Sequence, residues 1–217
     1  LVFYYDAENV KSYPGTGTNF YDLSSNGVTT IDRSTTTTDF ISTHPKCFDF
    51  DGTNDRFRRD SAQGEGVAFS GSFDFTWGAW AKPDGLSGTQ GVIGRRSIAD
   101  DIIGFSGTTV YIARAQTGAV SGGTAVVDVW NHIVATGNST NLYVYLNGIQ
   151  VNSGAHTTPF TGGFLNWYLG CKHDAYGEGL LTNPLNGKIA IAKCYNICLT
   201  DDQVLQNFNA HRSRFGI

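Results

Sequence analysis

The chain has 217 residues, of which 40% are hydrophobic and 13% aromatic, which is enough to fill one core and excludes a disordered or fibrous protein. Its formal net charge of -4 gives no positive field for nucleic acid, and no apolar run approaches the ~20 residues that span a bilayer, so we expect neither nucleic-acid binding nor membrane insertion. The 27 glycines, with many Thr, Asn and Tyr, favour an all-β chain, and such chains commonly form one unit at this length. We therefore predict a single domain over residues 1–217.

The first part of the chain shows period-two segments separated by turn residues. Residues 1–5 predict a strand, and the stretch 6–46, rich in Ser, Thr, Asn and Gly, predicts loop with short strands. A further strand over 47–50 ends at the turn Asp51-Gly52.

The next predicted strand covers residues 73–81. Its alternation places one set of apolar residues on a face that we expect to enter the core, with Trp80 on the opposite face. The predicted core residues of this strand are Phe75, Trp77, Ala79 and Ala81.

The clearest local signal in the chain is a hairpin over residues 141–151. The pair Asn147-Gly148 stands between two alternating apolar runs, and this pair favours the positive φ angles of a type I′ turn. By the same logic, Asp84-Gly85 and Asn186-Gly187 are predicted to be turns.

One helix is predicted, at residues 201–212. Thr200 is a suitable N-cap, Gln203 completes a capping box, and Val204 and Phe208 follow at helical spacing. Because no repeat of 20–50 residues is present, a sandwich is favoured over a propeller or a solenoid.

Cysteines and basic residues give weaker signals. The four cysteines match neither a zinc ribbon nor a dense disulfide framework, so we expect Cys194 and Cys198 to be reduced and Cys194 to be buried. Because the chain lacks Met and starts at Leu1, we expect a processed product or a segment of a longer polypeptide.

Three short basic groups are interpreted as solvated surface. They are Arg56-Phe57-Arg58-Arg59, Arg95-Arg96 and Arg212 with Arg214.

Five segments occur in the order found in a known family. They are FDFDGTND (48–55), FTWGAWAKP (75–83), VWNHIVAT (129–136), LYVYLNG (142–148) and LNGKIA (185–190). Together they resemble the laminin-G-like branch of the concanavalin A-like lectin/glucanase superfamily, over about residues 48–200. The resemblance implies an all-β jelly-roll sandwich of two antiparallel sheets, to which this chain adds one short C-terminal helix.

The two ends of the chain are similar to a variant of this domain in virion proteins of tailed bacteriophages. The segments that carry this similarity are DAEN (6–9), SYPGTG (12–17), DLS (22–24), QNFNA (206–210) and RFG (214–216). In those proteins the domain is part of fibres, appendages or capsid decorations. The resemblance therefore implies a virion or extracellular location.

Glycoside hydrolysis needs two carboxylates that face one bond, about 5–10 Å apart. The hydrolase members of the superfamily carry theirs as a Glu-x-Asp run on one strand, and no such run is present here. The adjacent pair Asp100-Asp101 does not share one face of a strand, the chain has no Gly-x-Ser-x-Gly elbow, and His132 is interpreted as structural. We therefore expect no enzymatic activity and keep a polysaccharide-cleaving glycoside hydrolase as an alternative.

The resemblance also implies a possible calcium site, because many relatives bind a calcium ion near the edge of the sandwich. A hard cation needs six to eight oxygen ligands, and Asp51 and Asp55 at the Phe-Asp-Gly turn, with Asp6, are the candidate ligands. Against this, Ala190 stands where relatives often carry an aspartate. Calcium is therefore the one cofactor considered for this chain, and turn capping by these aspartates is the favoured interpretation.

Sugar-binding surfaces of jelly rolls combine aromatic rings, which stack on sugars, with amides and carboxylates, which bond the hydroxyls. In the predicted hairpin strand the tyrosines point outward if the leucines and the valine face the core, and a Gly-rich loop near residue 176 is a second candidate. The rings have two alternative roles, cross-strand packing and subunit contact. The candidate carbohydrate-binding residues are Trp80, Tyr143, Tyr145, Trp167, Asp174 and Tyr176.

The sequence therefore predicts a non-enzymatic surface module of a virion that binds carbohydrate on the host surface. Weak capture by many copies would gain avidity, so we expect a homo-oligomer whose partners are glycans or other virion proteins. The alternative is a purely structural domain that decorates or stabilises the particle.

Overall fold

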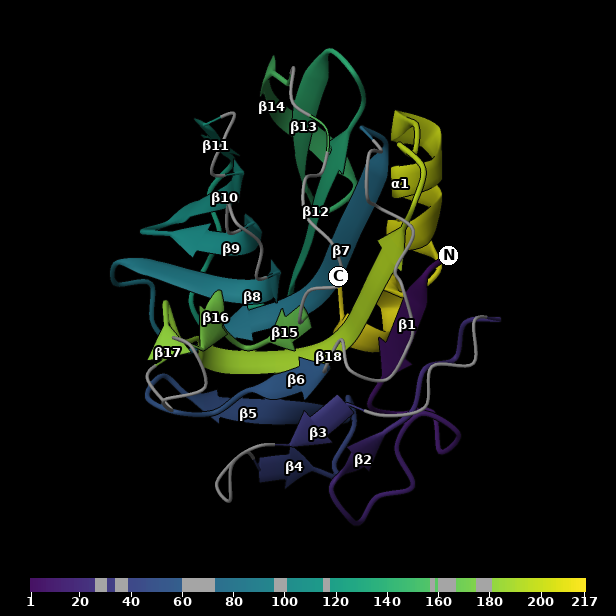
Figure 1. Cartoon of the computed structure of the whole chain (residues 1–217). Helices are drawn as coiled ribbons and strands as arrows, with labels where there is room; N and C mark the ends of the chain where they lie inside the picture. Colours follow the sequence, from purple (N-terminus) through teal and green to yellow (C-terminus); the bar gives the residue numbers. More distant parts are fainter. Residues whose placement is uncertain are drawn as a thin grey trace.

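Two large antiparallel sheets make up most of the computed structural model, which describes residues 1–25, 31–33, 39–59, 73–95, 101–114, 118–156, 159, 167–174 and 181–217 (Figure 1). Sheet A contains, in spatial order, β14 (Ile149–Ala155), β13 (Asn141–Leu146), β12 (Asn131–Gly137), β7 (Phe75–Pro83), β18 (Asn186–Tyr195), β5 (Cys47–Asp51) and β4 (Asp39–Ile41), and β1 (Phe3–Asp6) also pairs with β18. Sheet B contains β11 (Gly118–Gly122), β10 (Thr109–Arg114), β9 (Asp101–Ser106), β8 (Thr89–Arg95), β15 (Trp167–Leu169), β6 (Phe57–Arg59), β3 (Ile31–Arg33) and β2 (Asn19–Phe20). A small ladder joins β16 (His173–Asp174) and β17 (Leu181–Thr182). The predicted all-β jelly-roll sandwich is confirmed.

The core lies between the inner faces of the two sheets and is rich in aromatic rings. Phe75, Trp77, Ala79 and Ala81 of β7 enter it, as the period-two pattern predicts. The Trp77 ring meets the Trp167 ring of sheet B nearly at a right angle, with ring centroids 4.9 Å apart. Burial of one such large side chain contributes about 1.5–3 kcal/mol, so this layer accounts for much of the cohesion between the sheets.

One side of the sandwich is closed by contacts between edge strands. The Asn152 side chain of β14 donates a hydrogen bond to the Ser121 carbonyl of β11, with an N–O distance of 2.7 Å. A Cβ atom at Gly154 would lie 2.7 Å from the Val120 side chain, so glycine allows the two edges to approach. β13 and β14 are therefore held against sheet B.

The predicted turns have different outcomes. Asn147 and Gly148 have φ angles of 52° and 81° between β13 and β14, which confirms the type I′ hairpin. The turn predicted at Asn186-Gly187 is wrong, because these residues begin β18 and Gly187 pairs with Phe50 and Pro83. A Cβ atom at Gly187 would lie 2.5 Å from the Lys82 carbonyl oxygen, so this glycine serves close strand approach and not a turn.

The C-terminal helix packs on the outer face of sheet A. α1 (Asp201–Asn209) has the predicted capping box between Thr200 and Gln203, and it buries Val204 and Phe208. It ends three residues earlier than predicted, and a 3-10 helix, η2 (Arg212–Phe215), follows. The early end lets η2 fold back and bury Phe215 against the sheet.

Several basic residues lie deeper than the sequence suggested. Arg56 and Arg95 are buried, and the Arg214 side chain is 13% exposed, so the interpretation as solvated surface is wrong for these three residues, whereas Arg212 is exposed as expected. Arg95 pairs with Asp101 on the neighbouring strand, Arg214 pairs with Asp6 at the other end of the chain, and Arg56 donates to the Asn54 carbonyl.

Cys194 is buried and unbridged, as expected, and Cys198 is also a free thiol. Within the described residues, no helix is long and apolar enough to cross a membrane.

Candidate functional site

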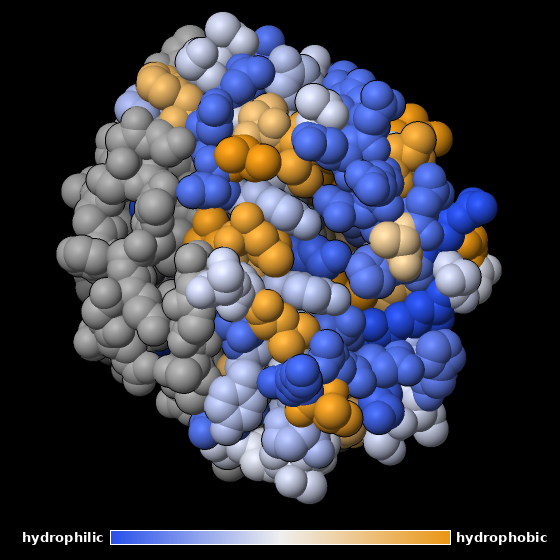
Figure 2. All heavy atoms as spheres, turned by 90° about the vertical axis from the view of Figure 1, so that its right-hand side faces the viewer, coloured by the Kyte–Doolittle hydropathy of each residue, from blue (hydrophilic) through white to orange (hydrophobic). Residues whose placement is uncertain are grey.

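The outer face of sheet A carries a group of polar and aromatic side chains that lie outside the core between the sheets. Strand register places side chains of β1, β18, β7, β12 and β13 in rows across this face. One row is Asp6, Ile191, Trp80 and His132, the next is Tyr4, Lys193, Gly78, Val134 and Tyr145, and the third includes Tyr195, Thr76, Thr136 and Tyr143. Seen from this side of the molecule, the surface is mainly hydrophilic, with hydrophobic residues in small separate groups (Figure 2).

The C-terminal segment covers the middle of this face. The Trp80 ring is stacked with the rings of Phe208 and Phe215, with centroid distances of 5.6 Å and 4.1 Å, and Trp80 is only 1% exposed. Trp80 therefore points away from the core, as predicted. The prediction that its ring can contact a sugar is wrong, because the ring is buried. The helix that buries this ring follows it by about 120 residues in the sequence, and strand alternation cannot reveal such a cover.

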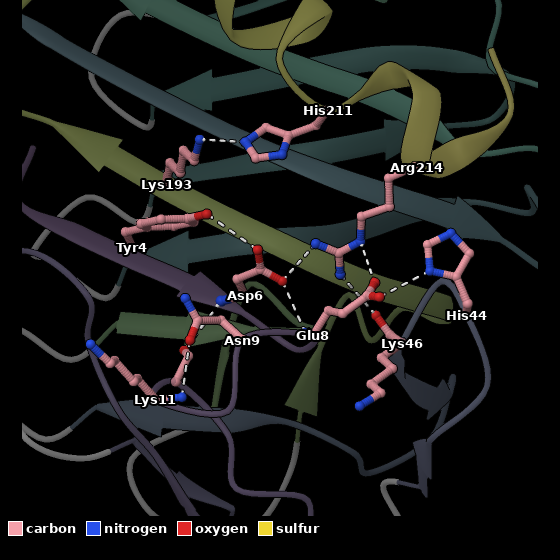
Figure 3. Close-up of polar contacts among 11 residues, drawn as sticks. Tyr4, Asp6, Glu8, Asn9, Lys11, His44, Lys46, Lys193, His211 and Arg214 are labelled. Carbon is pink, nitrogen blue, oxygen red and sulfur yellow. Dashed lines mark hydrogen bonds and ion pairs between the residues drawn. The ribbon is translucent and has the colours of Figure 1, made fainter.

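A cluster of charged side chains ties the first strand to η2 (Figure 3). Arg214 Nη1 lies 2.7 Å from Asp6 Oδ1, and Arg214 Nε lies 2.8 Å from Glu8 Oε2. The Tyr4 hydroxyl donates to Asp6 Oδ2, and His44 Nδ1 lies 2.9 Å from Glu8 Oε1. Burial acts to raise the pKa of Glu8, but the hydrogen bond with His44 and the Arg214 charge outweigh it and lower this pKa. A carboxyl group with a lowered pKa is a poor general acid.

A second polar group lies beside a small cavity under α1. Lys193 Nζ is 2.9 Å from His211 Nε2, and its ammonium group lies 4.6 Å from the centre of the Tyr4 ring. Burial lowers the pKa of Lys193 to about 8, that of His211 to about 4 and that of His132 to about 3. The cavity has a volume of about 20 Å³, and Gly78, which has no side chain, lies among its lining residues.

One part of this face, on β13 and β14, keeps partly exposed side chains although it packs against the buried cluster of Val134, Tyr145, Leu199 and Val204. Tyr143 on β13 is half-buried, and its hydroxyl lies 3.4 Å from Asn141 Nδ2. Ser153, directly opposite on β14, is exposed, and Thr140 is exposed in the turn between β12 and β13. Asn138 Oδ1 accepts three hydrogen bonds from residues 140 and 141 and so fixes that turn. We call Thr140, Asn141, Tyr143 and Ser153 the Tyr143 patch.

The other predicted carbohydrate-binding residues do not join this patch. Tyr145 is 2% exposed, and its hydroxyl donates to Asp201 Oδ1 across 2.8 Å, so α1 covers it. Trp167 is 4% exposed and belongs to the core between the sheets. The expectation that either ring faces a ligand is therefore corrected: the C-terminal helix covers Tyr145, as it covers Trp80, and Trp167 packs between the sheets. Asp174 lies in β16, opposite Leu181, and Tyr176 falls outside the described residues.

The candidate calcium ligands are engaged with other groups. Asp6 is bound by Arg214 and Tyr4, Asp51 Oδ1 accepts from the amides of residues 53 and 54, and Asp55 Oδ2 accepts from the Asp51 amide across 3.0 Å. A carboxylate that accepts hydrogen bonds from backbone amides two to four residues away in this manner caps a turn. Among the residues described, no three or more His, Cys, Asp and Glu side chains are grouped to hold a metal ion.

Of the pair Asp100-Asp101, the structure describes Asp101, whose carboxylate forms ion pairs inside the protein. Asp101 lies 3.0 Å from Arg95 and 3.2 Å from Arg114, and all three side chains are buried. Burial raises the pKa of Asp101 in spite of the two guanidinium groups. The Arg114 side chain also contacts His156. This group joins β8, β9 and β10 and presents no open carboxylate.

Sequence reasoning missed the Arg214, Asp6 and Glu8 cluster and the contact of Lys193 with His211. Arg214 and Asp6 are 208 positions apart, so no local spacing rule connects them. The local signal was the alternation of Tyr4 and Asp6, which places two polar groups on one side of an otherwise apolar strand, and Glu8 lies in the turn that follows.

Comparison with known proteins agrees with this architecture. A family model described as "Concanavalin A-like lectin/glucanases superfamily" matches residues 51–205. The chain belongs to this superfamily. Among curated protein sequences, none matches the chain significantly.

Solved structures of similar fold belong to several kinds of protein. Domain 4 of AbnA, a GH43 extracellular arabinanase from Geobacillus stearothermophilus, in complex with arabinotriose, has a TM-score of 0.70 and 19% identity over 95% of this chain and 97% of that one. Trypanosoma rangeli sialidase, with a TM-score of 0.69 and 16% identity, aligns with 99% of this chain but only 33% of its own. A structure of botulinum neurotoxin type C, described by its dependence on two ganglioside molecules for cell entry, has a TM-score of 0.68 and 10% identity over 96% of this chain and 50% of that one. Thus the chain spans one whole arabinanase domain, but only a third to a half of the other two chains.

Proposed function

We propose that this chain is a non-catalytic carbohydrate-binding module and that the Tyr143 patch contacts the sugar. The observation that carries the proposal is the position of Tyr143. Among the predicted aromatic residues whose side chains are described, Tyr143 alone keeps a partly exposed ring. That ring lies between an amide and a hydroxyl group, which are the two kinds of neighbour that bond sugar hydroxyls.

The sheet gives this patch a rigid base. Tyr143 pairs with Thr136 on one side and with Ser153 on the other, so its backbone is held by two neighbouring strands. Because the site is already ordered, little of its conformational entropy is lost on binding. Even a shallow site can then bind a flexible oligosaccharide. The arabinotriose complex and the ganglioside-dependent toxin are consistent with sugar binding by domains of this fold.

The more detailed part of the proposal concerns biological setting. We propose that the module acts on the surface of a virion, as part of a fibre, appendage or decoration, and captures glycans on a host in several copies. This part rests on the similarity of the two chain ends to tailed-bacteriophage proteins. Many linked copies would convert weak single-site affinity into stable attachment.

A glycan array tests the sugar-binding proposal. Wild-type protein is compared with Tyr143→Ala and with Tyr21→Ala, which removes an exposed tyrosine from another part of the surface. We expect the wild type and Tyr21→Ala to bind the same glycans and Tyr143→Ala to lose them. Equal binding by all three proteins would reject the patch, and release of new reducing ends would reject a non-catalytic role.

A second candidate function is a structural contact between virion subunits. Val126, Val127 and Val129 are 53%, 39% and 40% exposed in the loop before β12, which favours a protein interface at that end of the sheet. Sedimentation of wild type and a Val126→Ser, Val127→Ser double variant tests this role. Oligomers that the double variant dissociates would support it, and a monomeric wild type would reject it.

A further inference from the structure

Lys193 has no carboxylate partner within the described part of the chain, although most of its side chain is removed from water. Its Nζ contacts His211 Nε2 and the face of the Tyr4 ring, both of which are uncharged partners. The Asp6 carboxylate acts on Lys193 through space, but its own oxygens are bound to Arg214 and Tyr4. A desolvated cation without a counter-ion is unfavourable, because buried charges are normally paired.

Two further groups next to the same cavity have unmet hydrogen-bonding capacity. Trp80 Nε1 and His132 Nδ1 are buried without a hydrogen-bond partner among the described residues. The indole N–H can only donate, so what it lacks is an acceptor. Trp80, His132, Lys193 and His211 all line the cavity, and its volume of about 20 Å³ is enough for one small species.

The cavity exists because of a specific residue in the sheet. Gly78 pairs with Lys193 on β18 and with Val134 on β12, so it stands where the row of outward side chains is interrupted. A Cβ atom at this position would meet Val134 Cγ2 at 3.1 Å, with the other nearest atoms farther away. The C-terminal segment closes the gap with Val204 and Asn207 of α1 and with His211, which lies between α1 and η2.

We infer that this cavity is a binding site for a small monovalent anion of the halide class, held by the Lys193 ammonium group with N–H donors from Trp80 and His132. One anion would supply both the missing counter-charge and the missing acceptor, whereas a water molecule would supply only the acceptor. The charged and titratable groups around the site are Asp6, Arg214, His132, His211, Tyr4 and Tyr195. Of these, Asp6 opposes an anion, but Arg214 compensates its charge at 2.7 Å.

The site makes the stability of the fold depend on chloride. An anion that binds only the folded chain raises the melting temperature by about 3–6 °C for each tenfold rise in concentration above its Kd, for a domain of this size. Because the bound anion favours the charged amine, it also raises the pKa of Lys193, and binding weakens as Lys193 loses its proton near pH 8.

Thermal unfolding in sodium chloride and in sodium gluconate, at equal ionic strength and pH 7, tests the inference. Gluconate is too large for the cavity, so we expect the chloride-specific rise in the wild type and in Lys11→Met, which removes an exposed lysine. We expect no such rise in Lys193→Met, and a reduced one in Trp80→Phe, which keeps the ring stack and removes the N–H. No chloride-specific rise in the wild type, or an equal rise in Lys193→Met, would overturn the inference.

Diffraction from wild-type crystals soaked in sodium bromide provides a direct readout that does not depend on the folding of any variant. Anomalous signal between β18 and α1 would support the site. Bromide found only elsewhere on the surface, as an adventitious ion only, would overturn it.

Discussion

Two aromatic residues on the same face of sheet A, two rows apart, have different surroundings. Trp80 and Tyr143 both point away from the core, as their strand alternation predicts. Trp80 lies under Phe208 and Phe215, whereas Tyr143 packs beside Val204 of α1 and stays partly exposed. Strand period therefore gives the side of the sheet on which a residue lies, and the later segments of the chain decide whether that side is buried or available to a ligand.

Replacing Trp80 should have the largest effect on stability. We expect Trp80→Ala to lower the free energy of unfolding by about 3–5 kcal/mol, because it removes a ring packed between two others. Urea denaturation measures this difference. A loss below about 1 kcal/mol would mean that the C-terminal segment does not cover Trp80 in solution.

Acid should weaken the covered region next. His211 and His132 have folded pKa values of about 4 and about 3, against about 6.5 in the unfolded chain, so the unfolded chain binds more protons below pH 6.5. The two neutral histidines contribute their full stabilisation above pH 6.5, and this contribution is lost as the pH falls toward 4 and then 3. For each histidine, the folding equilibrium constant falls by at most about tenfold per pH unit.

Urea titrations of the wild type and His211→Gln between pH 7 and pH 4.5 measure this loss. We expect a shallower decline in the variant, because one of the two depressed histidines is absent. Parallel declines would show that His211 is not buried as described.

Loss of the helix cap should have a moderate effect. The Thr200 hydroxyl accepts a hydrogen bond from the Gln203 amide, and Gln203 Oε1 accepts one from the Thr200 amide. We expect Thr200→Ala to cost about 0.5–2 kcal/mol in urea denaturation. If the cap supports the cover over Trp80, this variant should also increase the accessibility of tryptophan to a fluorescence quencher, and unchanged quenching would argue against that link.

Replacing Tyr143 should have the smallest effect on stability. We expect Tyr143→Ala to change the free energy of unfolding by less than about 1 kcal/mol, since the ring is partly exposed at a sheet edge. The same urea experiment measures this change. A loss as large as that expected for Trp80→Ala would show that Tyr143 is a packing residue and would remove the contrast between the two rings.

Local signals in the sequence predicted much of the fold. The hairpin at Asn147-Gly148, the capping box at Thr200 and the inward face of β7 each depend on residues within a few positions of one another. The laminin-G-like segments supplied the sandwich. The Asn186-Gly187 prediction was wrong because glycine also permits close strand approach, and the pair alone does not distinguish this role from a turn.

The candidate site was predicted less completely. Tyr143 was found from strand alternation, but the burial of Trp80 and Tyr145 depends on a helix that follows them in the chain. Arg95 was interpreted as solvated because charge runs usually are, whereas Asp101 on the adjoining strand holds it inside the protein. These arrangements depend on long-range packing, which residue spacing does not encode.

Chemical-shift mapping with the best-binding oligosaccharide from the array tests the central claim most directly. We predict that the largest changes in the backbone amide signals fall on Asn141, Tyr143 and Ser153, with little change at Trp80 and Tyr145. Changes centred on sheet B, or no changes at any oligosaccharide concentration, would contradict the account.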